Sequence, residues 1–135
     1  MAVTPITVKR ELYADFHKDF TENPVNFDLA RKINEEAVKE SIRNLILTDR
    51  GERPFQPKLG SNIRAVLFDT VTPAITETVR EMISDTIRNY EPRANLISVD
   101  VSGDVDTNSI KATIIFNVIN SEEPITLEAT LNRVR

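Results

Sequence analysis

The chain contains no cysteine and no tryptophan, only three glycines, and a single histidine among its 135 residues. The absence of cysteine excludes a disulfide framework, a thiolate nucleophile and a cysteine-ligated metal site. Three scattered glycines cannot form a glycine-rich phosphate loop, and no Gly-x-Ser-x-Gly motif offers a serine nucleophile. His17 has no second histidine with which to share a metal ion. We therefore expect no cofactor and no metal.

Long apolar runs are also missing, because charged residues interrupt the chain throughout. No segment approaches the ~20 apolar residues that a membrane-spanning helix requires. The opening stretch MAVTPITVKRELYADFHKDF has no apolar core of the kind found in a signal peptide. The net charge of −4 argues against nucleic acid, since domains that bind it usually carry a clustered basic face. We expect a soluble protein with neither a membrane nor a nucleic-acid partner.

The length of the chain suits one domain, preceded by an arm. Residues 1–27 show no sustained hydrophobic period, although Val3, Ile6 and Val8 hint at a short extended piece. This otherwise polar stretch carries four aromatic residues, Tyr13, Phe16, Phe20 and Phe27. Such an arm packs either on its own domain or on another chain, and the sequence favours neither. We predict an extended amino-terminal arm over residues 1–27 and a single α+β domain over residues 28–135.

Two main helices and a short one are predicted in the first part of the domain. The first runs from Asp28 to near Thr48, because apolar residues recur at helical spacing: Leu29, Ile33, Ala37, Ile42, Leu45 and Ile46. Asn26 or Asp28 would cap it. Ser61 is the expected cap of a short helix that turns Ile63, Val66 and Leu67 inward. The second main helix starts at Thr72-Pro73 and ends by about Glu91, because Pro92 disfavours helical geometry in the residue before it.

The last third of the chain alternates apolar and polar residues, which predicts three strands. The inward positions would be Ile97, Val99 and Val101, then Ile110, Ala112, Ile114, Phe116 and Val118, then Ile125, Leu127, Ala129 and Leu131. Polar turns join the strands, so an antiparallel three-stranded sheet with the helices on one face is expected. Such a small sheet has edges that can accept a strand from another chain.

Two charged loops contain proline, RGERPFQPKLGS and YEPR. Proline limits the conformations of a loop, so less entropy is lost when the loop docks on a partner. Arginine suits interfaces because its planar fork binds carboxylates or carbonyls bidentately. Each loop therefore either docks on another protein or ties itself to its own domain through internal ion pairs. The residues alone leave both interpretations open.

Glycoside hydrolysis requires a pair of carboxylates, and the candidate members here are Glu52, Glu77, Glu81, Asp85 and Glu91. Three of these, Glu77, Glu81 and Asp85, recur every four residues and share the solvated face of a helix, where pKa values are weakly tuned. The acidic turn GDVDTNS lacks the full ligand series of a calcium loop, so an ordinary polar turn is expected there. No catalytic residue is predicted.

The two proline loops also carry a family resemblance. LTDRGERPFQPKLGSNI (47–63), LFDTVTP and IRNYEPR (87–93) resemble the baseplate wedge family of contractile-tailed phages, which is also called "lysozyme-like" and includes a baseplate subunit of type VI secretion systems. The motif Thr-x-x-Gly-x-Arg-x-x-x-Pro-x-x-Gly, the Thr-Pro helix start, Glu-Pro-Arg and the β-rich end occur in the same order. The similarity covers roughly residues 28–135, and the arm YADFHKDFTENPV resembles versions from large myophages.

This resemblance implies a structural virion protein of the tail baseplate, assembled in the host cytoplasm. Its implied partners are other wedge subunits and the tail sheath protein, with tail tube or hub proteins as further candidates. Glu91, Pro92 and Arg93 would dock on the wedge core bundle, and the loop with Arg50, Glu52, Arg53 and Pro54 would add wedge contacts. Strands 110–118 and 125–133 would accept sheath strands, through Ile110, Ile114, Phe116, Ile125, Leu127 and Leu131. The alternative is a peptidoglycan-degrading, lysozyme-like tail hydrolase that uses Glu91 or Glu52.

Overall fold

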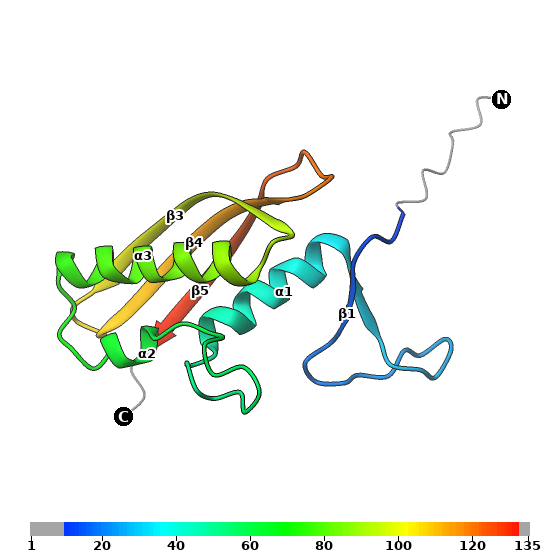
Figure 1. The fold of residues 1–135 in the computed structure, drawn as a ribbon, viewed down its shortest axis with the longest axis horizontal. Helices are drawn as coiled ribbons and strands as arrows, with labels where there is room; N and C mark the ends of the chain where they lie inside the picture. The colour runs from blue at the N-terminus through cyan, green and yellow to red at the C-terminus, as the bar shows by residue number, and fades with distance from the viewer. Residues whose placement is uncertain (1–9, 133–135) are drawn as a thin grey trace. The chain divides into compact units, whose positions relative to one another are not determined.

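The computed structural model describes residues 10–132, which form two compact units (Figure 1). Among the described residues, the amino-terminal unit comprises residues 10–37 and the carboxy-terminal unit residues 38–132. The extended piece expected at Val3, Ile6 and Val8 lies outside the described residues. No helix in the described range is long and apolar enough to cross a membrane. The fold class is α+β, as predicted.

The amino-terminal unit is a small antiparallel ribbon. Strand β1 (Ala14–Phe16) pairs with β2 (Arg31–Ile33), and helix α1 (Asn34–Leu47) begins directly after β2. The prediction of a helix from Asp28 was therefore wrong at its start. Residues 31–33 pair with β1 as a strand, and the buried Asn34 ends that pairing with a positive φ of 49°.

The side chain of Asn34 fastens the start of α1 to the chain before β1. Its Oδ1 accepts hydrogen bonds from the backbone N–H groups of Leu12 and Tyr13 at 2.8 and 3.3 Å. Its Nδ2 donates to the carbonyl of Arg10 at 3.1 Å. The side-chain amide of Asn34 thus satisfies three backbone groups. No local sequence pattern predicts these long-range contacts.

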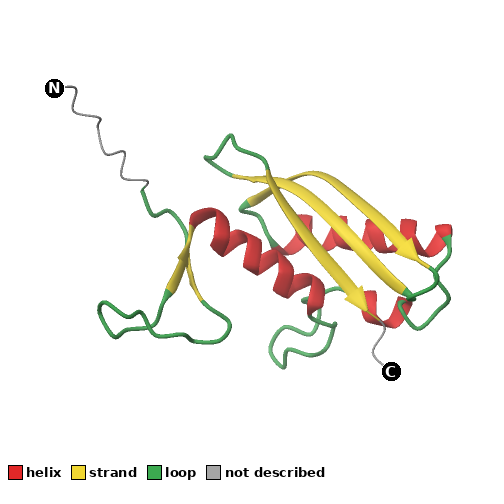
Figure 2. Ribbon diagram, turned by 180° about the vertical axis from the view of Figure 1, so that it is seen from behind, coloured by secondary structure: helices red, strands yellow, loops and turns green. Residues whose placement is uncertain are grey.

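The carboxy-terminal unit is a three-stranded antiparallel sheet with helices on one face. The strands are β3 (Ala94–Asp104), β4 (Ser109–Val118) and β5 (Ile125–Asn132), in the spatial order β3-β4-β5. Helices α2 (Ile63–Val66) and α3 (Pro73–Tyr90) complete the unit together with the part of α1 that follows Ala37. Seen from opposite sides, Figures 1 and 2 show α3 over one face of the sheet, with the other face bare.

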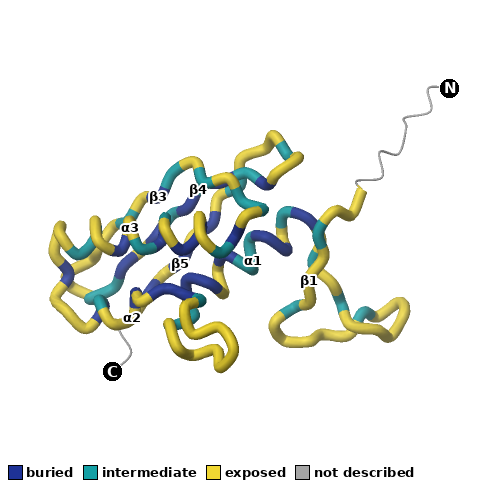
Figure 3. The backbone as a smooth tube through the Cα atoms, viewed as in Figure 1, coloured by how far each residue is buried: buried dark blue, intermediate teal, exposed yellow. Residues whose placement is uncertain are grey.

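Burial follows the predicted alternation along β4 and β5 (Figure 3). The inward side chains are almost fully covered, namely Ile110, Ala112, Ile114, Phe116, Val118, Leu127, Ala129 and Leu131. Their neighbours on the other face, such as Lys111 and Glu128, are exposed and form a 2.9 Å ion pair. Transfer of such apolar surface out of water is the main stabilising contribution to this sheet.

Strand β3 departs from the predicted pattern at Ile97. The register with β4 shifts between Leu96 and Ser98, which leaves Ile97 at a β-bulge and 56% exposed. Leu96 therefore pairs with Phe116 on the core face, while Val99 and Val101 keep their expected places opposite Ile114 and Ala112. A bulge inserts one extra residue, so the residues that precede it in the strand point to the opposite face from the one that simple alternation predicts.

Candidate partner-binding surfaces

The Glu-Pro-Arg motif lies where α3 gives way to β3. The predicted helix start is confirmed, because Thr72 Oγ1 accepts a hydrogen bond from Ile75 N and Pro73 occupies the first helical position. The helix ends at Tyr90, as Pro92 requires, and the backbone N–H of Glu91 still donates to Ile87 O at 2.9 Å. Glu91 therefore stands at a turn between two rigid elements.

Glu91 turns inward. Its side chain is only 2% exposed, and its Oε1 and Oε2 accept hydrogen bonds from Arg93 Nε and Nη2 at 2.6 and 2.8 Å. Ser41 Oγ on α1 donates to the same carboxylate at 2.5 Å. Pro92 is exposed, and the Arg93 side chain is 30% exposed. The exposed part of the motif is therefore Pro92 and part of the Arg93 side chain, while Glu91 is buried.

The contacts of Glu91 keep it charged. Burial alone would raise the pKa of Glu91, but the hydrogen bonds from Arg93 and Ser41 and the charge of Arg93 outweigh it, so this pKa lies below its ordinary value. A general acid needs the opposite shift. Ser41 was not predicted as a partner of Glu91, because a serine fifty positions away in the chain leaves no local sequence pattern for this contact.

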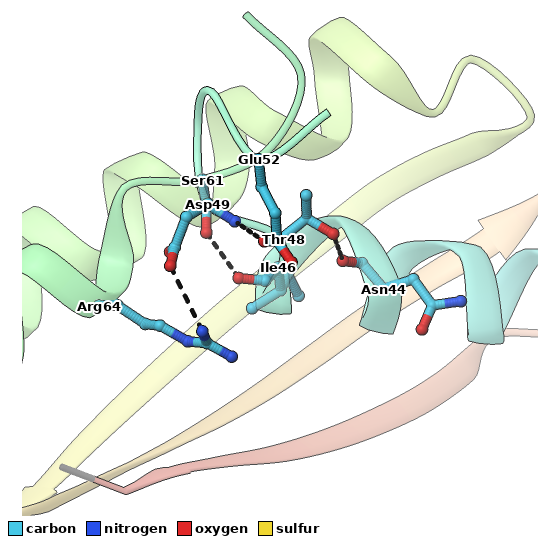
Figure 4. A network of polar contacts seen from close by, with 7 residues as sticks. All are labelled: Asn44, Ile46, Thr48, Asp49, Glu52, Ser61 and Arg64. Carbon is cyan, nitrogen blue, oxygen red and sulfur yellow. Dashed lines mark hydrogen bonds and ion pairs between the residues drawn. The ribbon is translucent and has the colours of Figure 1, made fainter. Parts of the chain in front are cut away.

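The second proline loop follows α1 and is closed at its base (Figure 4). Ser61 N donates to Thr48 O at 2.9 Å, and Ser61 Oγ donates to Ile46 O at 2.6 Å. The expectation that Ser61 caps the short helix was wrong, since Asn62 stands at the N-cap position and makes no side-chain cap bond. Ser61 instead satisfies a carbonyl at the end of α1, where no intrahelical donor remains.

Gly60 makes this closure possible. Its φ is +112°, and a Cβ placed on it would lie 2.4 Å from the carbonyl oxygen of Thr48. Only glycine allows the two backbone segments to approach so closely. Gly103, near the end of β3, is also crowded, because Val71 Cγ1 would lie 2.3 Å from a Cβ placed on it.

The predicted contact residues of this loop lie outside the closed base. Arg50, Glu52, Arg53 and Pro54 are all exposed. Glu52 Oε2 accepts a hydrogen bond from Asp49 N at 3.0 Å, and Arg64 Nη1 lies 3.4 Å from Asp49 Oδ2 (Figure 4). Glu52 therefore stabilises the turn itself, while the two arginines point their charge to solvent.

The predicted strand-acceptor residues lie on the core face of the sheet. Ile110, Ile114, Phe116, Leu127 and Leu131 are buried, and Ile125 is half-buried. The expectation that strand 110–118 accepts a partner strand was wrong, because β4 lies between β3 and β5 and is paired on both sides. Strand β5 has an outer edge with no strand neighbour among the described residues. The β4–β5 register runs without a shift from Ser109↔Asn132 to Phe116↔Ile125. Residue 133 of the predicted acceptor lies outside the described residues.

The carboxylates of α3 line an open groove of about 420 Å³ beside β3. Glu77, Glu81 and Asp85 are all exposed there, and they share the groove with Arg80 and Arg88. Arg80 lies 3.4 Å from Glu77 in an exposed ion pair of the weak surface kind. All three carboxylates are exposed, as expected for a solvated helix face.

The acidic turn after β3 is built from its own side chains. Asp104 Oδ1 accepts from Asp106 N at 3.0 Å, and Oδ2 accepts from Thr107 Oγ1 at 2.8 Å. The hydrogen bonds from Thr107 and Asp106 lower the pKa of Asp104. No group of three or more potential metal ligands occurs in residues 10–132. The side chains thus make an ordinary polar turn.

Comparison with known proteins identifies the family to which this chain belongs. A family model described as baseplate wedge protein gp25 matches residues 33–123, which is more than half of the chain. The baseplate wedge protein gp25 of Enterobacteria phage T4 is 32% identical over 115 residues, covering 85% of this chain and 86% of the T4 protein. The chain belongs to the baseplate wedge protein gp25 family. The family resemblance carried by the two proline loops is thereby confirmed.

Solved structures support the same fold for this wedge-family chain. A chain in the baseplate of the anti-feeding prophage has a TM-score of 0.70 at 24% identity, covering 82% of this chain and 89% of that one. A proposed tail lysozyme of Geobacter sulfurreducens has a TM-score of 0.68 at 24% identity, covering 75% of this chain and 92% of that one. At these identities the likeness shows the fold alone. As a wedge-family member, the chain is a structural component of a phage-like tail baseplate.

Proposed function

We propose that this wedge-family chain joins the baseplate wedge to the first ring of the tail sheath and has no enzymatic activity. Its Glu-Pro-Arg turn docks on the core bundle formed by larger wedge subunits, and its loop 49–60 adds wedge contacts. The free edge of β5 then pairs with an extended strand of the sheath protein. The single observation that carries the proposal is the Glu91–Arg93 pair, in which a buried carboxylate holds a partly exposed arginine side chain beside an exposed proline.

The geometry of this pair suits docking. Glu91 uses both oxygens on Arg93, so the guanidinium is held in one orientation before any partner arrives. An ordered side chain loses little conformational entropy on binding, which favours affinity. Glu91 thus acts from beneath the surface, while Pro92 and Arg93 face the core bundle.

The edge of β5 suits strand addition better than the edge of β3. The β4–β5 register is regular over eight residue pairs, whereas β3 carries the bulge at Ile97. Bulges twist an edge away from incoming strands and are a common protection against pairing. A regular edge offers its backbone groups in sequence to an added strand.

The docking proposal is tested by replacing Arg93→Gln and measuring copurification with the wedge subunits of the same particle. Glutamine keeps a donor for Glu91 but removes the charge and the fork. We expect wedge association to be lost. The variant should also unfold at a lower temperature, because the buried Glu91 loses its counter-charge, so association is measured well below that temperature, where circular dichroism shows the variant folded. Arg88→Gln, an exposed arginine on α3, is the matched control. Unchanged association of the Arg93 variant would refute this assignment of the turn.

Strand addition can be tested by disulfide trapping, because the chain has no cysteine of its own. Thr130→Cys places a thiol on β5, and single cysteines are placed along the terminal segments of the sheath protein. Neighbouring strands bring Cβ atoms within disulfide reach, so one register should cross-link. Asp100→Cys on β3 is the control at the opposite edge. Trapping at β3 instead of β5 would reverse the proposed acceptor.

The alternative function is a lysozyme-like peptidoglycan hydrolase, the activity for which the structurally similar Geobacter protein is named. The lowered pKa of the buried Glu91 works against a general acid at that position. Peptidoglycan zymography with the purified chain separates the two functions. A clear lytic band that disappears with Glu91→Gln or Glu52→Gln would favour the hydrolase.

A further inference from the structure

Phe55, at the outer end of loop 49–60, is 97% exposed, the most exposed of the large hydrophobic residues in the described part of the chain. Its ring contributes almost nothing to the core, since nearly all of its surface meets water. The adjoining positions Pro54 and Gln56 are also exposed. A phenylalanine kept in water by its own fold has its surface available for a partner.

The loop presents this ring on a closed backbone. Gly51 N donates to Pro57 O at 2.9 Å, which draws the two sides of the loop together, and Gln56 N donates to Arg53 O at 3.2 Å. Tyr90 Oη on α3 donates a hydrogen bond to Lys58 O at 2.6 Å and so attaches the second half of the loop to the helix. The loop therefore needs little further ordering when it binds.

The charge around the ring has one prevailing sign. Arg50, Arg53 and Lys58 are exposed, and the single acidic residue between them, Glu52, already accepts a hydrogen bond from Asp49 N. The loop is thus locally basic on a chain whose net charge is −4. Charge complementarity favours a partner that offers carboxylates around an apolar centre.

We propose that Phe55 is the anchor of the loop and inserts into an apolar socket rimmed by aspartate or glutamate on another baseplate subunit. This inference rests on the proposed assembly function and names the contact that the loop makes. A single aromatic anchor surrounded by charged residues has the composition of an interface hot spot. A lipid surface is the less favoured occupant, because a lone ring on a closed loop buries little apolar area.

The first test compares Phe55→Ala with Phe68→Ala, a matched control whose ring is 62% exposed after α2. The probe is the purified complex of the other wedge subunits of the same particle. We expect Phe55→Ala to weaken binding at least about thirtyfold and Phe68→Ala to change it by less than about threefold. Neither change touches a buried group, so both variants fold and their unfolding curves overlay.

The outcomes separate this inference from the function on which it rests. If the unaltered chain binds the wedge complex and Phe55→Ala binds equally well, the anchor is wrong and the docking function stands. If the unaltered chain does not bind the wedge complex at all, both the proposed function and the role of Phe55 as an anchor are refuted. The double variant Arg53→Gln, Lys58→Gln should weaken binding and reduce its salt dependence. An unchanged salt dependence would overturn the acidic rim.

A second test identifies what the ring touches. With p-benzoylphenylalanine in place of Phe55, irradiation of the assembled complex should cross-link a wedge subunit within a segment that contains apolar and acidic residues. A cross-link to a second copy of this chain would overturn the proposal. So would Phe55-dependent sedimentation with vesicles of equimolar phosphatidylcholine and phosphatidylserine, which would show that the ring enters lipid.

Discussion

Arg93 Nε lies 2.6 Å from Glu91 Oε1, and Arg93 Nη2 lies 2.8 Å from Glu91 Oε2, so that one guanidinium holds both oxygens of a buried carboxylate. The two residues are separated in sequence only by Pro92, whose ring restricts the backbone between them. The pair therefore closes the junction of α3 and β3 from inside the fold. The same contact orders the arginine at the surface, which links the stability of the domain to its proposed docking.

The first prediction concerns pH. The pKa of Glu91 is lowered in the folded state, so its contribution to the free energy of unfolding is present above the unfolded-state pKa of about 4.3 and is lost as pH falls through the folded-state pKa. Glu91→Gln should cost about 2–3 kcal/mol at pH 7, because Arg93 and Ser41 lose their charged partner. Urea unfolding at a series of pH values should show this cost shrinking below about pH 4.

The control for this prediction is Glu81→Gln, which removes an exposed carboxylate from the same helix. Its unfolding free energy should stay within about 0.5 kcal/mol of the unaltered chain at every pH. If the cost of Glu91→Gln were the same at pH 3 as at pH 7, the stabilising ionisation of Glu91 would be excluded.

The second prediction separates two glycines of the same loop. Gly60→Ala meets both a positive φ of +112° and the Thr48 carbonyl at 2.4 Å, so it should cost more than about 2 kcal/mol of stability. Gly51→Ala meets a φ of +89° but has no atom within 4 Å, so strain alone should cost about 1 kcal/mol. Thermal or urea unfolding of both variants measures the difference. Equal costs would mean that the close approach at Thr48 is absent.

The third prediction concerns Ser61, whose hydroxyl satisfies Ile46 O in the buried base of the loop. Ser61→Ala leaves that carbonyl without its donor and should cost about 1–2 kcal/mol. Asn62→Ala should be nearly neutral, because the Asn62 side chain makes no cap bond to α2. The comparison is made by urea unfolding. A greater cost at Asn62 than at Ser61 would mean that the Asn62 side chain does cap α2 and that the hydrogen bond from Ser61 to Ile46 O contributes little.

The fourth prediction concerns the amino-terminal unit, where no apolar side chain between residues 10 and 36 is buried. Phe16, Phe20 and Phe27 are 51%, 67% and 79% exposed, and isolated two-stranded ribbons are marginally stable in water. Limited proteolysis of the free chain should therefore cut within residues 10–33 first and leave the region after Val38 intact. In the assembled baseplate the same sites should be protected. Early cleavage inside the sheet would contradict this order of stability.

Local rules account for most of the carboxy-terminal unit. The Thr72-Pro73 start and the Pro92 stop of α3 were predictable because capping and proline act within one helical turn. The alternation along β4 and β5 was predictable because a half-buried strand must repeat every two residues. The start of α1 and the bulge at Ile97 were not predictable in this way. Pairing with β1 and register with β4 depend on residues distant in the chain.

The candidate partner-binding surfaces likewise depend partly on local sequence and partly on tertiary contacts. The sequence by itself determined that two rigid, charged proline loops exist, that three antiparallel strands follow, and that the chain resembles the baseplate wedge family, because these follow from local chemistry and motif order. Only the tertiary structure decided that Glu91 turns inward onto Ser41 and Arg93 and that Phe55 stays in water. Burial depends on what packs on a residue from elsewhere in the chain, and no pattern of neighbours in sequence carries that information.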